Sequence, residues 1–180
     1  MVTAERSTTV GEILLSQAGS LLLFVGIASS LILLSSVGRP IGASSKNLVL
    51  FSQALPFVLL TYCFVTDARS IELVYRFGGD DLPLFYRVSA VWSSRSGPLL
   101  LWAAMMAIVT RLMSNKEHVV SVEVAIMHAW TAFLLVLSAM LGPFESTISS
   151  TSSGLNPLLQ TDLMVIHPPV VFAFYSLCIA

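Results

Sequence analysis

The chain alternates long apolar runs with short polar connections, and the apolar runs have the length of membrane helices. A bilayer core about 30 Å thick needs about 20 apolar residues at helical rise. Four runs meet or approach that length, at residues 13–37, 48–65, 98–113 and 119–141. A fifth opens at His167 and covers residues 167–180, which is too short to cross. The pattern predicts an all-α integral membrane protein with four complete transmembrane helices and the start of a fifth.

Features inside the runs fit this interpretation. Small residues recur on one side of the first run, at Ser16, Gly19, Gly26 and Ser30, and predict a face for close helix packing. The polar stretch 66–97 contains a short apolar segment, and we expect it to form loops with short helices at the membrane interface.

Composition and charge exclude several classes of function. Hydrophobic residues make up 56% of the chain and charged residues 11%, under half the roughly 25% usual for soluble domains. The net charge is −1 without a basic stripe, which argues against nucleic-acid binding. Cys63 and Cys178 stand alone in apolar runs, so neither a disulfide framework nor a paired-cysteine metal or redox motif is present.

The distribution of basic residues predicts the orientation. Arg39 and Lys46 lie in the first connection, and Arg111 and Lys116 lie in the third. Basic connections remain on the inner side of a membrane. We therefore expect the N-terminus, the long second loop and the segment leading into His167 to face the outer side.

His167 is the first candidate for chemistry because Pro168 and Pro169 follow it. A residue before proline favours an extended backbone, and prolines fit the first turn of a helix. The sequence therefore predicts an imidazole held at a helix mouth near the outer interface. Such an imidazole can serve as an axial ligand of haem iron. It can equally cap the helix or bind a lipid headgroup, and the residues alone leave both interpretations open.

His128 lies near the middle of the fourth run, where ionisable groups are rare. It could bind a buried haem, take part in a proton path, or remain a neutral histidine bonded to another helix. Glu123, five residues earlier, lies about 140° away around the helix and is expected at the interface. Aromatic residues also gather near the third run, as a membrane-interface belt or as a platform for a porphyrin: Tyr75, Phe85, Tyr86, Trp92 and Trp102.

Three segments, taken in order, resemble the CcmF-type cytochrome c haem lyases, membrane proteins of c-type cytochrome maturation. They are residues 82–92 (LPLFYRVSAVW), residues 92–102 (WSSRSGPLLLW), and NPLLQ at 156–160 followed by VIHPP at 165–169. The resemblance places the chain over the N-terminal portion of the family. Residues 1–180 would then form a single transmembrane segment of a larger or split haem-lyase assembly.

The resemblance implies that His167 is one of two axial ligands to haem iron. The haem would be b-type, in transit to apocytochrome c, whose Cys-x-x-Cys-His thiols add to its vinyl groups. The other residues that the matching motifs place at the haem are Trp92, Asn156, Pro157, Gln160, Pro168 and Pro169. The expected partners are the remaining lyase pieces, a haem chaperone, apocytochrome c and the lipid bilayer. Alone, the chain is not expected to be active.

Two departures from the family pattern support an alternative. Arg95-Ser96 stands where the family has a His-Glu pair, and the family's tryptophan-rich haem motif lies beyond Ala180. The alternative is a non-catalytic structural subunit of a larger respiratory or transport complex. A proton or solute path through His128 and Glu123 is a third interpretation. Residues 1–12 contain no Arg-rich transit peptide. The expected location is a bacterial cytoplasmic membrane or the mitochondrial inner membrane.

Overall fold

The computed structural model describes residues 2–79, 81–114, 118–147 and 154–180, and these residues form helices joined by short connections. The long helices are α1 (Val2–Leu34), α2 (Ala43–Val65), α5 (Ser96–Met113), α6 (Val122–Met140) and α7 (Asp162–Ile179). Shorter elements are α3 (Glu72–Phe77), α4 (Leu84–Ala90), and the 3₁₀ turns η1 (Val91–Ser93) and η3 (Pro157–Leu159). Five helices are long and apolar enough to cross a membrane, which confirms the all-α integral membrane class.

The fifth helix differs from the prediction. It begins at Asp162 and has 18 residues, so it is long enough to cross rather than an incomplete span. The Thr161 side chain caps it by accepting a hydrogen bond from the Met164 backbone N–H. Because this cap and the Asp162 carboxylate start the helix early, Pro168 and Pro169 lie inside it rather than in its first turn.

α1 begins at Val2, well before the predicted start at residue 13, and the other boundaries shift by a few residues. α2 begins at Ala43 rather than at residue 48, and α1 ends at Leu34 rather than at residue 37. α6 begins at Val122 because the preceding residues pair with the first connection: Gly38 N–H donates to the Val120 carbonyl at 2.8 Å. The two connections at this end of the bundle are thereby joined to each other.

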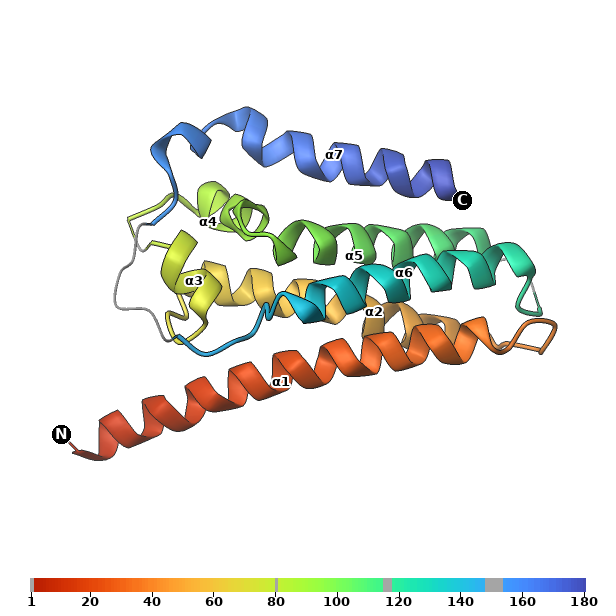
Figure 1. Ribbon diagram of the computed structural model, residues 1–180, viewed down its shortest axis with the longest axis horizontal. Helices are drawn as coiled ribbons and strands as arrows, with labels where there is room; N and C mark the ends of the chain where they lie inside the picture. The colour runs from red at the N-terminus through yellow and green to blue at the C-terminus, as the bar shows by residue number, and fades with distance from the viewer. Residues whose placement is uncertain (1, 80, 115–117, 148–153) are drawn as a thin grey trace.

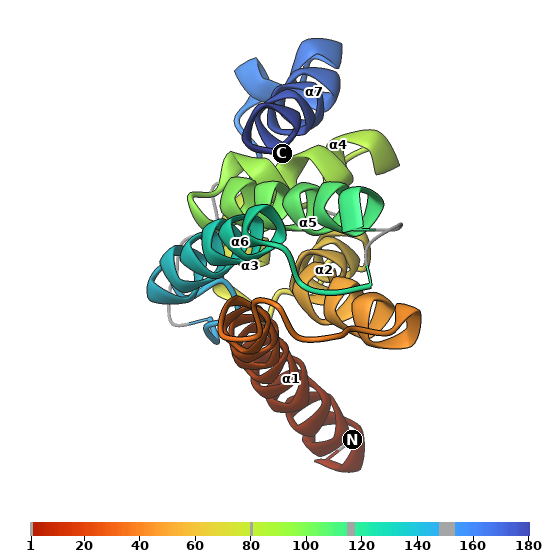
Figure 2. The same ribbon diagram turned by 90° about the vertical axis from the view of Figure 1, so that its right-hand side faces the viewer.

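Four helices form a closed ring, and α7 lies outside it. α1 packs against α2 and α6, while α5 also packs against α2 and α6. α7 contacts α5 and α4 from the outer side of α5 (Figures 1 and 2). The N-terminus, α3, α4 and the start of α7 lie at one end of the molecule, and the α1–α2 and α5–α6 connections lie at the other (Figure 1). The two basic connections therefore lie at the same end of the bundle.

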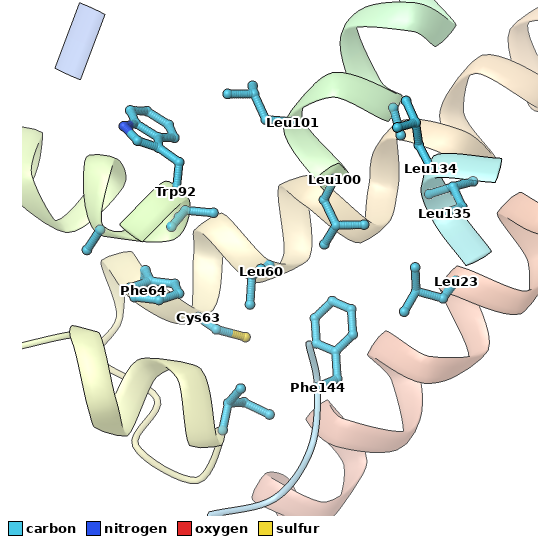
Figure 3. Close-up of a cluster of buried hydrophobic side chains, with 14 of the residues drawn as sticks. Leu23, Leu60, Cys63, Phe64, Trp92, Leu100, Leu101, Leu134, Leu135 and Phe144 are labelled. Carbon is cyan, nitrogen blue, oxygen red and sulfur yellow. The ribbon is translucent and has the colours of Figure 1, made fainter. Parts of the chain in front are cut away.

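The main core is made of apolar side chains from all four ring helices and from the loop after α6. Figure 3 shows Leu23, Leu60, Cys63, Phe64, Leu100, Leu134, Leu135 and Phe144 converging there. The predicted small-residue face of α1 is confirmed. A Cβ at Gly19 would collide with the Phe144 ring, and one at Gly26 would lie 2.8 Å from the Ser52 carbonyl oxygen. These glycines therefore set how closely α1 approaches its neighbours.

Candidate functional site

His167 lies on the outer face of α7, in the second turn of the helix, and its side chain is exposed. Among the described side chains of α7, Ser176 is the buried one. Nine residues separate the two, which is two and a half turns, so they point in opposite directions. The predicted position at a helix mouth was wrong, since the helix begins five residues before His167. The imidazole is presented away from the four-helix ring.

The face around His167 is otherwise apolar. Large exposed side chains flank it along the helix: Leu163, Ile166, Val170, Phe174 and Leu177. Only 6% of the helix's span is buried inside the structure. A single imidazole on an apolar face can donate one nitrogen ligand to a metal. The described residues contain no group of three histidine, cysteine or acidic side chains able to hold a metal ion by themselves.

Pro168 and Pro169 leave two carbonyls of α7 without their helical donors. Proline has no N–H, so the Met164 and Val165 carbonyls receive no hydrogen bond from residues four positions later. The Trp92 indole N–H takes over the first of these, donating to the Met164 carbonyl at 2.7 Å. The expectation that Trp92 contacts haem stays a prediction. Its observed contact holds the turn of α7 that carries His167.

A tight turn positions Trp92. The Ser94 hydroxyl donates to the Val91 carbonyl at 2.9 Å and accepts from the Gly97 N–H at 3.0 Å. A Cβ at residue 97 would collide with the Val91 carbonyl, so only glycine fits there. Arg95 is exposed in this turn, whereas Ser96, which follows it, is buried. Arg95-Ser96 thus presents a cation in this turn and no imidazole or carboxylate.

The segment before α7 is anchored at Leu155, which is buried in the core. The 3₁₀ turn η3 follows, with the Leu159 N–H donating to the Asn156 carbonyl at 2.8 Å. The Gln160 side-chain amide donates to the Leu155 carbonyl at 3.4 Å. Asn156 and Pro157 are exposed. These contacts lead the chain into α7, and Leu155 is the buried residue among them. The expectation that Asn156, Pro157 and Gln160 act at the haem stays a prediction.

A groove of about 390 Å³ lies between α4 and the first turns of α7. Its lining residues are Pro83, Phe85, Tyr86, Asp162, Val165 and Ile166. Trp102 does not join Phe85 and Tyr86 here. It stacks on Phe172 of α7, with ring centroids 5.6 Å apart. The predicted aromatic cluster is therefore divided between this groove and the α5–α7 contact.

His128 is far from this site and buried among α1, α2 and α6. Its Nδ1 lies 3.0 Å from the Gln53 side-chain nitrogen. Of the interpretations considered for His128, a histidine bonded to another helix is the one observed. Glu123 is exposed on another side of α6, as expected. The structure does not bring His128 and His167 together.

Comparisons with known proteins agree with the motifs. The cytochrome c-type biogenesis protein ccl1 of Rhodobacter capsulatus is 32% identical over 68% of this chain and 20% of its own length. CycK of Rhizobium meliloti is 32% identical over 68% of this chain and 19% of its own length. CcmF of Escherichia coli is 31% identical over 71% of this chain and 21% of its own length. No family model and no solved structure matches.

The fold and these similarities define a polytopic α-helical membrane protein of a known kind. The chain is a homologue of the CcmF-type cytochrome c biogenesis proteins, which confirms the resemblance seen in its motifs. The matched part amounts to about a fifth of each of these relatives.

Proposed function

We propose that the chain is the N-terminal membrane piece of a CcmF-type cytochrome c haem lyase and acts in cytochrome c maturation. In this role it supplies His167 as one axial ligand to a haem that is completed by other parts of the assembly. The observation that carries the proposal is the position of His167, exposed on the face of α7 that the four-helix ring does not cover. The similarity to cytochrome c biogenesis proteins supports the choice of haem.

An exposed imidazole suits a haem that lies between this chain and another protein surface. Haem iron takes axial ligands from both faces of the porphyrin, and one of them is available here. The apolar side chains around His167 would be covered by the porphyrin and by the helices on its far side. Haem is the cargo of the reaction, and its vinyl groups are the positions to which the apocytochrome thiols add.

The neighbouring residues would hold His167 in place. The Trp92 indole fixes the Met164 carbonyl, three residues before His167, against the turn that opens α5. The Leu155 anchor and the Thr161 cap determine where α7 starts. Asn156, Pro157 and Gln160 shape the approach to His167. Pro168 makes the Trp92 contact necessary because it removes the backbone donor to the Met164 carbonyl, and Pro169 removes the donor to the Val165 carbonyl.

The partners are the remaining lyase pieces, a haem chaperone and apocytochrome c. His167 and the N-terminus lie on the outer side of the membrane, where the acceptor cytochrome is found. The membrane is a bacterial cytoplasmic membrane or a mitochondrial inner membrane, and the bacterial relatives favour the first.

The proposal is tested by His167→Ala in cells that carry the remaining lyase components. We expect covalent haem in c-type cytochromes, measured by haem stain on denaturing gels, to fall at least about tenfold, since even the loss of a residue that only supports a metal ligand costs about that much. Val170→Ala, on the same exposed face, is the matched control and should leave assembly unchanged. Immunoblots of membranes should show equal amounts of all variants, because both side chains are exposed. Normal cytochrome assembly with His167→Ala would remove the proposed role.

A second function is favoured by the largely unburied α7 and by Arg95-Ser96 in place of the His-Glu pair. It is a non-catalytic structural subunit of a larger membrane complex, packed through α7. This alternative predicts that the chain co-purifies with a large respiratory or transport complex without haem absorbance. It also predicts that bulky polar substitutions such as Phe174→Arg release the chain from that complex while His167→Ala does not.

A further inference from the structure

Three polar side chains meet inside the membrane near the end of the bundle formed by the α1–α2 and α5–α6 connections. Ser30 comes from α1, Gln53 from α2 and His128 from α6, and each is at most 5% exposed. The Gln53 side-chain nitrogen lies 2.8 Å from the Ser30 hydroxyl oxygen and 3.0 Å from His128 Nδ1. Polar groups at this depth are costly unless they are bonded, so the arrangement has to be accounted for atom by atom.

The acceptors around Ser30, Gln53 and His128 determine where the hydrogens of these three side chains lie. The Ser30 hydroxyl donates to the Gly26 carbonyl at 2.8 Å, so its oxygen accepts from Gln53. The second Gln53 N–H then points at His128 Nδ1, which is bare, and the ring proton lies on Nε2. The Gln53 carbonyl oxygen, Oε1, is buried and has no hydrogen-bond partner in the described part of the chain. One strong acceptor in the cluster is therefore unused.

A small cavity adjoins the cluster. It has a volume of about 20 Å³, and a water molecule needs at least about 10–15 Å³. Gln53 and His128 line it, and so do Lys46, Thr110 and Ser114, which extend toward the connections. His128 lies six residues after the start of α6, or about 9 Å along the helix. The cavity thus provides polar surface between the end of the bundle and the buried imidazole.

We propose that Ser30, Gln53 and His128 form a proton-binding site that is reached by water from the end of the bundle at the α1–α2 and α5–α6 connections. Water in the cavity delivers a proton to the lone pair of His128 Nδ1. The Gln53 amide then rotates by half a turn. Its two N–H bonds to Ser30 and His128 break, and Oε1 accepts from the new Nδ1–H. The Ser30 hydroxyl keeps its bond to the Gly26 carbonyl, and the freed amide N–H groups donate to water in the cavity. The orphaned oxygen of the neutral state becomes the acceptor of the protonated state.

The charged groups around the cavity are engaged with other partners or exposed. Lys46 of α2 donates to the Ser114 carbonyl, and Arg111 of α5 donates to the Asn47 side chain at 2.7 Å. Glu123 of α6 and His118 of the preceding connection are exposed. α1 contributes no charged residue between positions 13 and 34. The site is independent of His167, which lies on another helix and near the other end of the bundle.

Access of water is tested by deuterium exchange at the imidazole C2 position, measured by mass spectrometry on the full chain in lipid nanodiscs. We expect His128 to exchange at least about tenfold more slowly than the exposed His118 but at a measurable rate. Thr110→Leu narrows the cavity and should slow His128 at least about tenfold further, leaving His118 unchanged. Thr110→Val, which removes the hydroxyl but keeps the volume, is the matched control. Equal His128 rates in wild type and Thr110→Leu would overturn the water route.

Proton binding is tested by nitrogen NMR of the wild-type chain, which needs no variant that could fail to fold. As the pH is lowered stepwise from about 8, the bare-nitrogen signal of His128 should disappear as both ring nitrogens become protonated. Gln53→Met, similar in size but without the acceptor, should retain that bare-nitrogen signal to a lower pH than the wild type. A wild-type His128 that keeps one bare nitrogen throughout would overturn the proposal. Equal titration in wild type and Gln53→Met would also overturn it.

Discussion

The hydrogen bond from Trp92 to the Met164 carbonyl should stabilise the first turns of α7 by more than an ordinary side-chain contact. Pro168 removes the backbone N–H that would otherwise serve this carbonyl, so the indole supplies a donor that the helix lacks. Trp92→Phe keeps an aromatic ring and removes that donor. The perturbation therefore isolates one bond at the point where α7 meets the α4–α5 turn.

The free-energy cost of Trp92→Phe follows from the length and burial of this hydrogen bond. At 2.7 Å the bond is short, and Trp92 is 9% exposed. A neutral hydrogen bond contributes about 0.5–1.5 kcal/mol net, and a buried acceptor left unpaired costs about 1–3 kcal/mol. Trp102→Phe is the matched control, because it loses the same atoms while its Nε1 has no partner among the described residues. We expect Trp92→Phe to cost about 1–2 kcal/mol more than Trp102→Phe.

Amide hydrogen exchange of α7 in nanodiscs measures this difference locally. The excess cost corresponds to roughly 5–30-fold faster exchange in the first two turns of the helix, at about 1.4 kcal/mol per factor of ten. The pair Trp92→Phe and Pro168→Ala also forms a double-mutant cycle. Alanine at residue 168 returns a backbone N–H to the Met164 carbonyl, so Trp92→Phe should cost about 1 kcal/mol less in that background.

Two results would refute the reasoning. Trp92→Phe and Trp102→Phe could change exchange in α7 equally, which would show that ring size and not the donor matters. The cost of Trp92→Phe could also be the same with and without Pro168→Ala. In that case the carbonyl freed by the proline would not be the group that Trp92 serves.

Two further predictions concern the ends and the core of the bundle. Thr161→Ala removes the cap of α7 and should destabilise that helix by about 0.5–2 kcal/mol. The effect is measured as faster amide hydrogen exchange confined to residues 162–165. Exchange rates equal to those of the wild type in that segment would contradict the cap. Phe144→Ala empties the space beside Gly19 and should lower the free energy of unfolding by about 3–5 kcal/mol. The thermal unfolding midpoint in detergent should therefore fall well below that of Phe133→Ala, whose side chain is 49% exposed. Equal midpoints would contradict the placement of Phe144 in the core.

The sequence was sufficient to predict the features that depend on local composition. Apolar run length located the first four spans, because each has or approaches the length that a bilayer requires. The small-residue face of α1 was readable because residues at helical spacing share one side of a helix. The similarity to known proteins rested on motifs that are contiguous in the chain. In each case the sequence pattern and the feature that it predicts lie within one segment of the chain.

The features that the sequence did not predict are of two kinds. One is the start of α7, where two helix-start patterns compete within one segment, and the other is contacts between residues far apart in the chain. Two adjacent prolines were taken to open the fifth helix, although Thr161-Asp162, a recognisable N-terminal pair, starts it earlier. The contact between Trp92 and the Met164 carbonyl spans 72 positions in the chain. The Gln53 partner of His128 lies 75 positions away. Neither partner could be identified from one sequence, since nothing local specifies which helix faces which.

The ring of α1, α2, α5 and α6 has a consequence for how the molecule is assembled. Because α1 and α6 lie side by side, these four helices complete their mutual contacts once residue 140 is in the membrane. α7 is then added to an already finished surface. Of the four ring helices, α5 carries the contacts with this last helix, including Trp102 stacked on Phe172, so a change in the tilt of α7 would be felt first at α5. The contacts that close the ring are thus distinct from those that attach α7 to it.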